Sequence, residues 1–202
     1  MKSRVIPLFP SVIHNLQVEN YPAVKDRVLK FIYEEQKKDP QGRSVSNLGG
    51  WQSQDTYANA ENDNILRKIV EGCVYGYFRS SDIWEDGVRI RLNNLWININ
   101  KRGNSNRFHV HPGSTLSGVM WIKSSPNCGK LMFESPHQYY ASNELRSFTK
   151  EFMEQYYPYA HYWFVPAEGD IVIFPSYLSH CVEPSDSDED RISISFNLCF
   201  SE

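Results

Sequence analysis

Three histidines have the spacing of metal ligands. His109 and His111 flank a single residue in a short alternating segment, and His180 lies in a second one. Alternate side chains of a strand point to the same face, so His109 and His111 would project together if residues 107–111 are extended. Imidazole binds iron, zinc and nickel well. The pair alone is weak evidence, because ordinary surface or core histidines also occur at this spacing, and the distant His180 strengthens it.

The residues before His180 follow a recognisable order. A turn at Gly169 leads into the apolar segment 170–174, then a turn at Pro175, then His180. This order resembles the second motif of cupin-like folds, and Gly103 followed by the histidine pair resembles the first. Cupins usually carry a glutamate a few residues after the pair, where this chain has Thr115 and Leu116. A standard cupin site is therefore not expected.

A further motif, Arg191-x-Ser193, follows His180 and would present both side chains on one strand face. The order of histidine pair, distal histidine and Arg-x-Ser resembles the 2-oxoglutarate/Fe(II) oxygenases. That resemblance implies that Arg191 forms a forked ion pair with the far carboxylate of 2-oxoglutarate and that Ser193 adds a hydrogen bond. A guanidinium suits this role because it offers two parallel donors. The alternative is that Arg191 is a surface residue after the acidic loop 186–190.

Three longer runs narrow the resemblance. They are His-Val-His-Pro-Gly-Ser-x-Leu-Ser-Gly-Val at 109–119, Phe-Pro-Ser-x-Leu-x-His at 174–180 and Arg-Ile-Ser-Ile-Ser-Phe-Asn at 191–197. Together they resemble a family of 2-oxoglutarate/Fe(II) oxygenases from marine bacteria and their phages, over roughly residues 5 to 200. The resemblance implies Fe(II) as cofactor, 2-oxoglutarate as cosubstrate, and hydroxylation of a C–H bond with release of succinate and CO2.

The composition of the metal triad departs from the usual two histidines and one carboxylate. His111 stands where the carboxylate is expected. In one interpretation the three histidines form the site, which is then one unit more positive and favours dianionic 2-oxoglutarate. In a second, Glu134 completes the site. In a third interpretation, His111 is the first ligand and Gly113 stands at the carboxylate position. Glycine has no side chain to bind the metal, so that position stays open, as in the 2-oxoglutarate halogenases, where a halide fills it. A site that is vestigial or holds zinc or nickel is a further alternative.

Other polar and aromatic residues are weaker candidates for the pocket. Asn98 lies on an alternating segment whose polar face could line the pocket, and Ser117 could reach 2-oxoglutarate. Taken alone, each residue is better explained by ordinary packing. The tyrosines at 139–140 and 156–162 could form a substrate lid, a dimer surface or simple packing.

The elements that position these residues fall into two parts. Apolar residues at helical spacing predict helices over 22–38 and 62–79, and 44–59 reads as a loop. Eight short strands then predict a sandwich or barrel, at 88–100, 107–111, 115–122, 130–133, 162–165, 170–174, 178–182 and 191–200. With the resemblance, the expected fold is mainly β (α+β): a double-stranded β-helix (jelly-roll, cupin-like) with flanking N-terminal helices. One domain is expected over 1–202, with the helical part at about 20–80 and the β-helix core at about 88–200.

Composition sets the remaining expectations. The chain has 202 residues and a formal charge of −3, which gives no general attraction to nucleic acid or to an anionic membrane. Neither a membrane span nor a signal peptide is apparent, so a cytoplasmic setting is expected. The four cysteines lack metal-like spacing and read as reduced thiols.

The sequence does not identify the substrate, which is a small molecule or a side chain. A homodimer is compatible with the sequence. The alternative function is a cupin-like metal-binding module that binds a small ligand without oxygenase activity.

Overall fold

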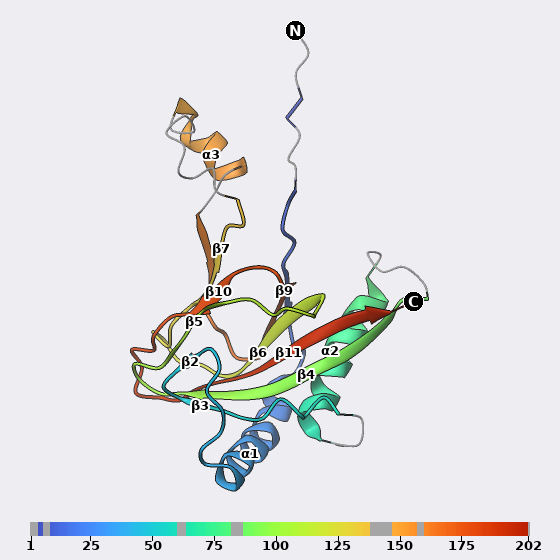
Figure 1. Ribbon diagram of the computed structural model, residues 1–202, viewed down its shortest axis with the longest axis vertical. Coiled ribbons are helices and arrows are strands. Elements are labelled where there is room, and N and C mark those ends of the chain that lie inside the picture. The colour runs from blue at the N-terminus through green and yellow to red at the C-terminus, as the bar shows by residue number, and fades with distance from the viewer. Residues whose placement is uncertain are drawn as a thin grey trace.

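In the computed structural model, two antiparallel sheets lie face to face, and two helices cover the outer face of one of them (Figure 1). The structure describes residues 4–5, 9–59, 64–81, 87–137, 147–156 and 160–201. Within this part of the chain, no helix is long and apolar enough to cross a membrane. All four cysteines are free thiols.

Eleven strands and three helices make up the described fold. The strands are β1 (His14–Gln17), β2 (Asn47–Leu48), β3 (Trp51–Gln52), β4 (Arg89–Asn100), β5 (Ser105–His109), β6 (Leu116–Lys123), β7 (Leu131–Glu134), β8 (His161–Phe164), β9 (Asp170–Pro175), β10 (His180–Val182) and β11 (Arg191–Ser201). The helices are α1 (Pro22–Lys38), α2 (Ile65–Ser80) and α3 (Lys150–Tyr156). One sheet has the order β1-β9-β6-β11-β4-β3, and the other has the order β2-β5-β10-β7-β8.

Strand β11 separates the apolar core from the polar pocket. It pairs with β4 on one side and β6 on the other. Its alternation sends one set of side chains towards the helices and the other set between the sheets. The helix-facing set is Ile192, Ile194, Phe196 and Leu198, all fully buried. The set between the sheets is Arg191, Ser193, Ser195 and Asn197.

The two N-terminal helices cover the six-stranded sheet because each has one apolar stripe. α1 begins at Pro22, a residue suited to the first helical turn. α2 is capped by Asn64, whose side chain accepts a hydrogen bond of 2.9 Å from the Arg67 amide. α2 buries Leu66, Val70, Val74 and Phe78, and α1 buries Val28 and Ile32, against the apolar faces of β4, β6, β9 and β11.

The structure differs from the sequence prediction in three places. The expected loop 44–59 contains β2 and β3, which extend one edge of each sheet. Strand β5 ends at His109, so His111 lies beyond it. Strand β1 forms from His14–Gln17, ahead of the first element that the sequence predicted. Helix α3 covers part of the tyrosine-rich stretch, whereas Tyr139 and Tyr140 lie outside the described residues.

Because Ile194 is fully buried at the centre of the six-stranded sheet, truncating it should leave a cavity. We expect Ile194→Ala to lower the free energy of unfolding by about 2–5 kcal/mol. Urea denaturation monitored by circular dichroism measures this. The control is Val165→Ala, at a residue 68% exposed, which should change stability by less than about 0.5 kcal/mol. Equal effects of the two substitutions would contradict the assigned core.

Candidate active site

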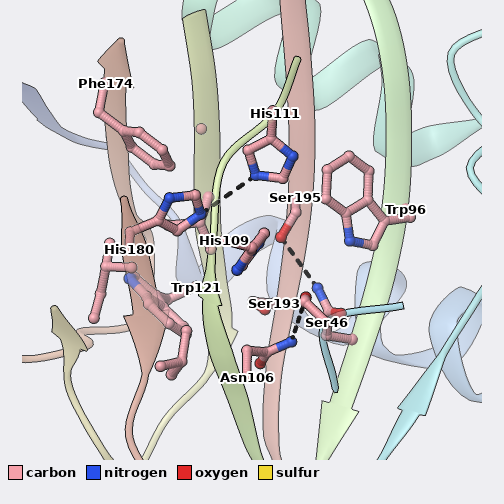
Figure 2. A pocket seen from close by; sticks show the side chains of 15 residues that line it. Ser46, Trp96, Asn106, His109, His111, Trp121, Phe174, His180, Ser193 and Ser195 are labelled. Atoms are coloured by element: carbon pink, nitrogen blue, oxygen red, sulfur yellow. Dashed lines mark hydrogen bonds between the residues drawn. The ribbon is translucent and has the colours of Figure 1, made fainter. Parts of the chain in front are cut away.

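The three predicted histidines converge between the sheets (Figure 2). His109 on β5 is the direct cross-strand partner of His180 on β10. His111 follows β5, and its Nε2 lies 3.3 Å from Nε2 of His180. The three potential ligand atoms all lie within 4.8 Å of one another. Two imidazoles at right angles around one ion would hold their nitrogens about 3.0 Å apart, given metal–nitrogen bonds of about 2.1 Å. The spacing therefore fits two adjacent positions around a single ion.

Backbone carbonyls fix the orientation of two of the rings. Nδ1 of His109 donates to the Arg107 carbonyl at 2.8 Å, and Nδ1 of His180 donates to the Leu178 carbonyl at 2.9 Å. Because a carbonyl can only accept, each Nδ1 carries the proton and each Nε2 keeps its lone pair. Metal-binding histidines in proteins are oriented by partners of this kind.

A β-bulge in β5 turns His109 towards the site. His180 pairs with His109, whereas Val182 pairs with Asn106, so β5 has one extra residue between these pairs. Bulges bend a strand and redirect its side chains. As a result Asn106 and His109 both line the pocket, and the Arg107 carbonyl lies against the His109 ring.

Burial keeps the three imidazoles neutral. It lowers the pKa of His109, lowers the pKa of His111 to about 4 and lowers the pKa of His180 to about 3. Repulsion from a charge on His109 lowers the latter two pKa values further. Neutral imidazole is the form that binds metal. The cluster is therefore ready to accept an ion at neutral pH without first losing protons.

The pocket beside the histidines has an empty volume of about 450 Å3, which includes space open to solvent. Its walls combine aromatic side chains with small polar ones. Trp96 faces His111 with ring centroids 5.7 Å apart (Figure 2). Asn98 and Ser193 line the pocket, and Asn98 donates to Ser195 Oγ at 3.1 Å.

Arg191 lies on the same face of β11 as Ser193, one step farther from the histidines, and is 1% exposed. It is therefore not the surface residue of the alternative interpretation. It does not line the pocket; its guanidinium donates to the carbonyls of Cys128, Glu183 (3.0 Å) and Asn104 (3.5 Å). Burial lowers the pKa of Arg191 to about 10, so it stays charged at neutral pH.

No acidic side chain of the described residues pairs with Arg191. A buried cation that is matched only by neutral acceptors is costly, so a bound anion would compensate it. The turn at Gly129 makes room for this arginine, because a Cβ there would lie 2.7 Å from Arg191 Nη1. Gly129 also has φ +85°, a backbone conformation that favours glycine.

Several sequence candidates lie outside the cluster. Glu134 is exposed and comes after the inward-facing Phe133, and the three histidines alone form a metal-capable group among the described residues. Gly113 lies in a turn at φ +82°, and His109 rather than His111 is the first histidine of the cluster. Ser117 is buried but hydrogen-bonded to Ser176 and Asn197, at 2.8 and 2.7 Å.

The structure adds pocket residues that the sequence did not suggest. Ser46 and Asn106 line the same pocket and are hydrogen-bonded to each other at 3.2 Å. Ser46 comes from the segment expected to be a loop. No periodic or chemical signal marked either residue, because their placement depends on how β2 pairs with β5.

Sequence comparison identifies the family of this chain. A family model described as "Putative 2OG-Fe(II) oxygenase" matches residues 94–197, which include the three histidines, Arg191 and Ser193. The chain belongs to this family. It is an oxygenase that depends on Fe(II) and 2-oxoglutarate, rather than a cupin-like binding module. No curated protein matches the sequence of this oxygenase.

Solved structures support the fold of the oxygenase. HygX from Streptomyces hygroscopicus, with nickel, 2-oxoglutarate and hygromycin B bound, has a TM-score of 0.63 and 10% identity over 94% of this chain and 83% of its own. The 2-oxoglutarate-dependent carbocyclase SnoK of nogalamycin biosynthesis has a TM-score of 0.65 and 14% identity over 92% and 78%. A prolyl hydroxylase from Trichoplax adhaerens has a TM-score of 0.63 and 12% identity over 93% and 83%. The predicted double-stranded β-helix is confirmed.

Because all three imidazoles contribute to one small cluster, removing the most buried of them should release the metal. Loss of a group that only hydrogen-bonds to a metal ligand typically weakens metal binding by roughly 10- to 100-fold. We expect His180→Ala to weaken metal binding by more than this, because it removes a ligand itself. His111→Asp should retain metal, since it restores a carboxylate to the triad. Metal content after dialysis measures both. Glu134→Gln is the control and should match the wild type; loss of metal in this variant would restore the carboxylate alternative.

The lowered histidine pKa values predict acid sensitivity of the metal-free protein. The unfolded chain binds these protons near pH 6.5, whereas folded His111 and His180 bind them only near pH 4 and 3. The unfolded state therefore holds more protons between these limits, and the free energy of unfolding should fall as pH drops from about 6.5 to about 4. Urea denaturation across this range measures the slope. The change in the free energy of unfolding with pH should be shallower in His180→Asn than in the wild type. Equal slopes in the two proteins would contradict the burial of a neutral His180.

Proposed function

We propose that His109, His111 and His180 together hold the Fe(II) of this oxygenase as a face of three histidines. The observation that carries the proposal is the convergence of their ring nitrogens, with the Nδ1 protons of His109 and His180 bound by carbonyls. Zinc or nickel would also suit three imidazoles, since ligand type alone does not select iron. The assignment of Fe(II) comes from the family and not from the ligand set.

We also propose that Arg191 and Ser193 bind the far carboxylate of 2-oxoglutarate. Arg191 supports this because it is a buried cation for which no acidic partner is described. Ser193 supports it because its side chain lines the pocket between Arg191 and the histidines. A guanidinium and a hydroxyl together offer the donors that a buried carboxylate requires.

The bound cofactors supply the oxidising chemistry, in which 2-oxoglutarate and dioxygen yield succinate, CO2 and one oxygen atom for the substrate. The protein supplies position and exclusion of water. Phe174 and Phe133 pack against His180, with ring centroids 4.6 and 5.9 Å away. Three neutral ligands leave a divalent site one unit more positive than a triad with one carboxylate, which favours binding of a dianion.

We infer that the product is a hydroxylated small molecule or side chain. The solved structures of the same fold hold ligands of both kinds, hygromycin B in HygX and a peptide fragment in the Trichoplax enzyme. We further propose that the chain acts as one domain, since helices α1 and α2 share a core with the six-stranded sheet.

Removing the guanidinium of Arg191 should weaken 2-oxoglutarate binding far more than metal binding. We expect Arg191→Ala to raise the apparent KM for 2-oxoglutarate by at least about tenfold, because a charged hydrogen bond to a buried carboxylate is lost. Arg191→Lys should recover part of the loss, since it keeps the charge but not the fork. Succinate release against 2-oxoglutarate concentration measures this. A weak visible absorption band on anaerobic addition of Fe(II) and 2-oxoglutarate reports binding. Unchanged 2-oxoglutarate use by Arg191→Ala would overturn the assignment.

A further inference from the structure

We propose that the substrate of this oxygenase carries an anionic group, a carboxylate or a phosphate, which Arg107 binds with help from Arg43 in a cleft beside the histidines. The inference rests on the proposed function, because it takes the histidine cluster as the reacting centre. The cleft has an empty volume of about 710 Å3, including space open to solvent, and shares Trp96, His109 and His111 with the first pocket.

The charges in this cleft favour an anion. Its described lining contains two arginines, Arg43 and Arg107, and a single acidic residue, Asp55. Asp55 already pairs with Arg43 at 2.8 Å. Arg107 has no ion pair with any residue in the described part of the chain. The cleft therefore has a surplus of one positive charge, and the charge of a bound metal ion adds to it.

The position of Arg107 in the chain limits how far a bound anion can lie from the histidine cluster. Arg107 lies in the β5 bulge, two residues before His109. Because two residues of extended chain span at most about 7 Å, the Cα atoms of Arg107 and His109 are no farther apart than that. An acid group held by Arg107 would thus leave a carbon a few bonds away near the histidine cluster.

The remaining walls suit a polar molecule with one flat or apolar part. Asn94 and Asn197 both line the cleft and are joined by a hydrogen bond of 3.4 Å between their amides. Side-chain amides can donate to and accept from hydroxyl or amino groups. Trp96 supplies an aromatic surface on the same wall. A small polar acid satisfies these features better than a hydrocarbon chain does.

The segment that carries Arg43 and Asp55 is held in place before any ligand binds. Strand β2 pairs with β5 and strand β3 pairs with β4, so the segment joins the edges of the two sheets. Buried Asn47 organises its turn by donating to the carbonyls of Arg43 and Gly49, both at 3.3 Å. A preformed site of this kind costs less ordering on binding.

The first experiment measures anion binding directly. The protein is loaded with Ni(II) and saturating 2-oxoglutarate, so that the metal and Arg191 are occupied, and is titrated with inorganic phosphate by calorimetry. We expect Arg107→Gln to weaken phosphate binding by about tenfold, as for a lost charged hydrogen bond. Arg102→Gln is the matched control, because Arg102 is an exposed arginine paired with Asp188 outside the cleft. Equal phosphate affinity in the wild type and Arg107→Gln would overturn the proposal.

The second experiment measures turnover. Succinate release above the substrate-free rate is compared for carboxylic acids and their primary amides, and for the same acids as free molecules and as peptide C-termini. We expect acids to stimulate release more than their amides, and Arg107→Gln to remove that preference. An uncharged best substrate, used equally well by Arg107→Gln, would overturn the anion site. Stimulation by the peptide forms alone would identify a peptide as the source of the acid group.

Failure of the proposed function is distinguishable from failure of this inference. If the wild type forms no absorption band with Fe(II) and 2-oxoglutarate, the proposed metal and cosubstrate roles fail. If the band forms equally in Arg107→Gln while phosphate binding is unchanged, only the anion site fails. Loss of the band in Arg107→Gln would also count against the inference, because the Arg107 side chain would then serve the metal site.

Discussion

The positions of Arg191 and Ser193 depend on how β11 pairs with its two neighbours. Because side chains alternate along a strand, the pairing with β4 and β6 puts isoleucines against the helices and polar residues between the sheets. A slip of one residue would place Ser193 in the apolar core and Ile192 in the pocket. The burial of the helix-facing side chains thus fixes the register, and the register fixes where Arg191 and Ser193 lie.

The cleft and pocket have an unusual charge balance for a metal enzyme. The proposed ligands are three neutral imidazoles, the cleft beside them is lined by Arg43 and Arg107, and the proposed 2-oxoglutarate partner Arg191 is a buried cation. Of the described lining residues, Asp55 is the one acid, and Arg43 neutralises it. The protein therefore provides positive charge that its small-molecule partners must compensate. Binding of metal and of anionic molecules should reinforce each other, because a bound metal ion strengthens the attraction for an anion and a bound anion offsets the repulsion between the arginines and the metal.

Much of this arrangement was predictable from the sequence, because it depends on local pattern. Helix α1 occupies the expected residues, and β4, β6, β9 and β11 lie within one or two residues of their predicted ranges. The histidines could be grouped because their motifs occur in a known order. The alternation of side chains along a strand also grouped Arg191 with Ser193 on one face of β11.

The parts that were not predictable depend on contacts between distant segments. β2 and β3 have two residues each, too few for any periodicity, and they exist because the sheet edges offer partners. The bulge in β5 is defined by its register with β10, which the sequence of β5 alone does not contain. For the same reason Arg43, Ser46 and Asp55 were missed. Glu134 follows the inward-facing Phe133, and the structure leaves it exposed and outside the cluster.

The bulge in β5 has a consequence for how this enzyme can diverge. Residue 107 serves the metal site through its backbone carbonyl and the cleft through its side chain. A substitution there changes the charge or size offered to the substrate but keeps the carbonyl that orients His109. Relatives can therefore acquire new substrate preferences at this position while their metal site stays intact. An inserted or deleted residue in the same strand has no such freedom, because it would shift the ligand and the cleft together.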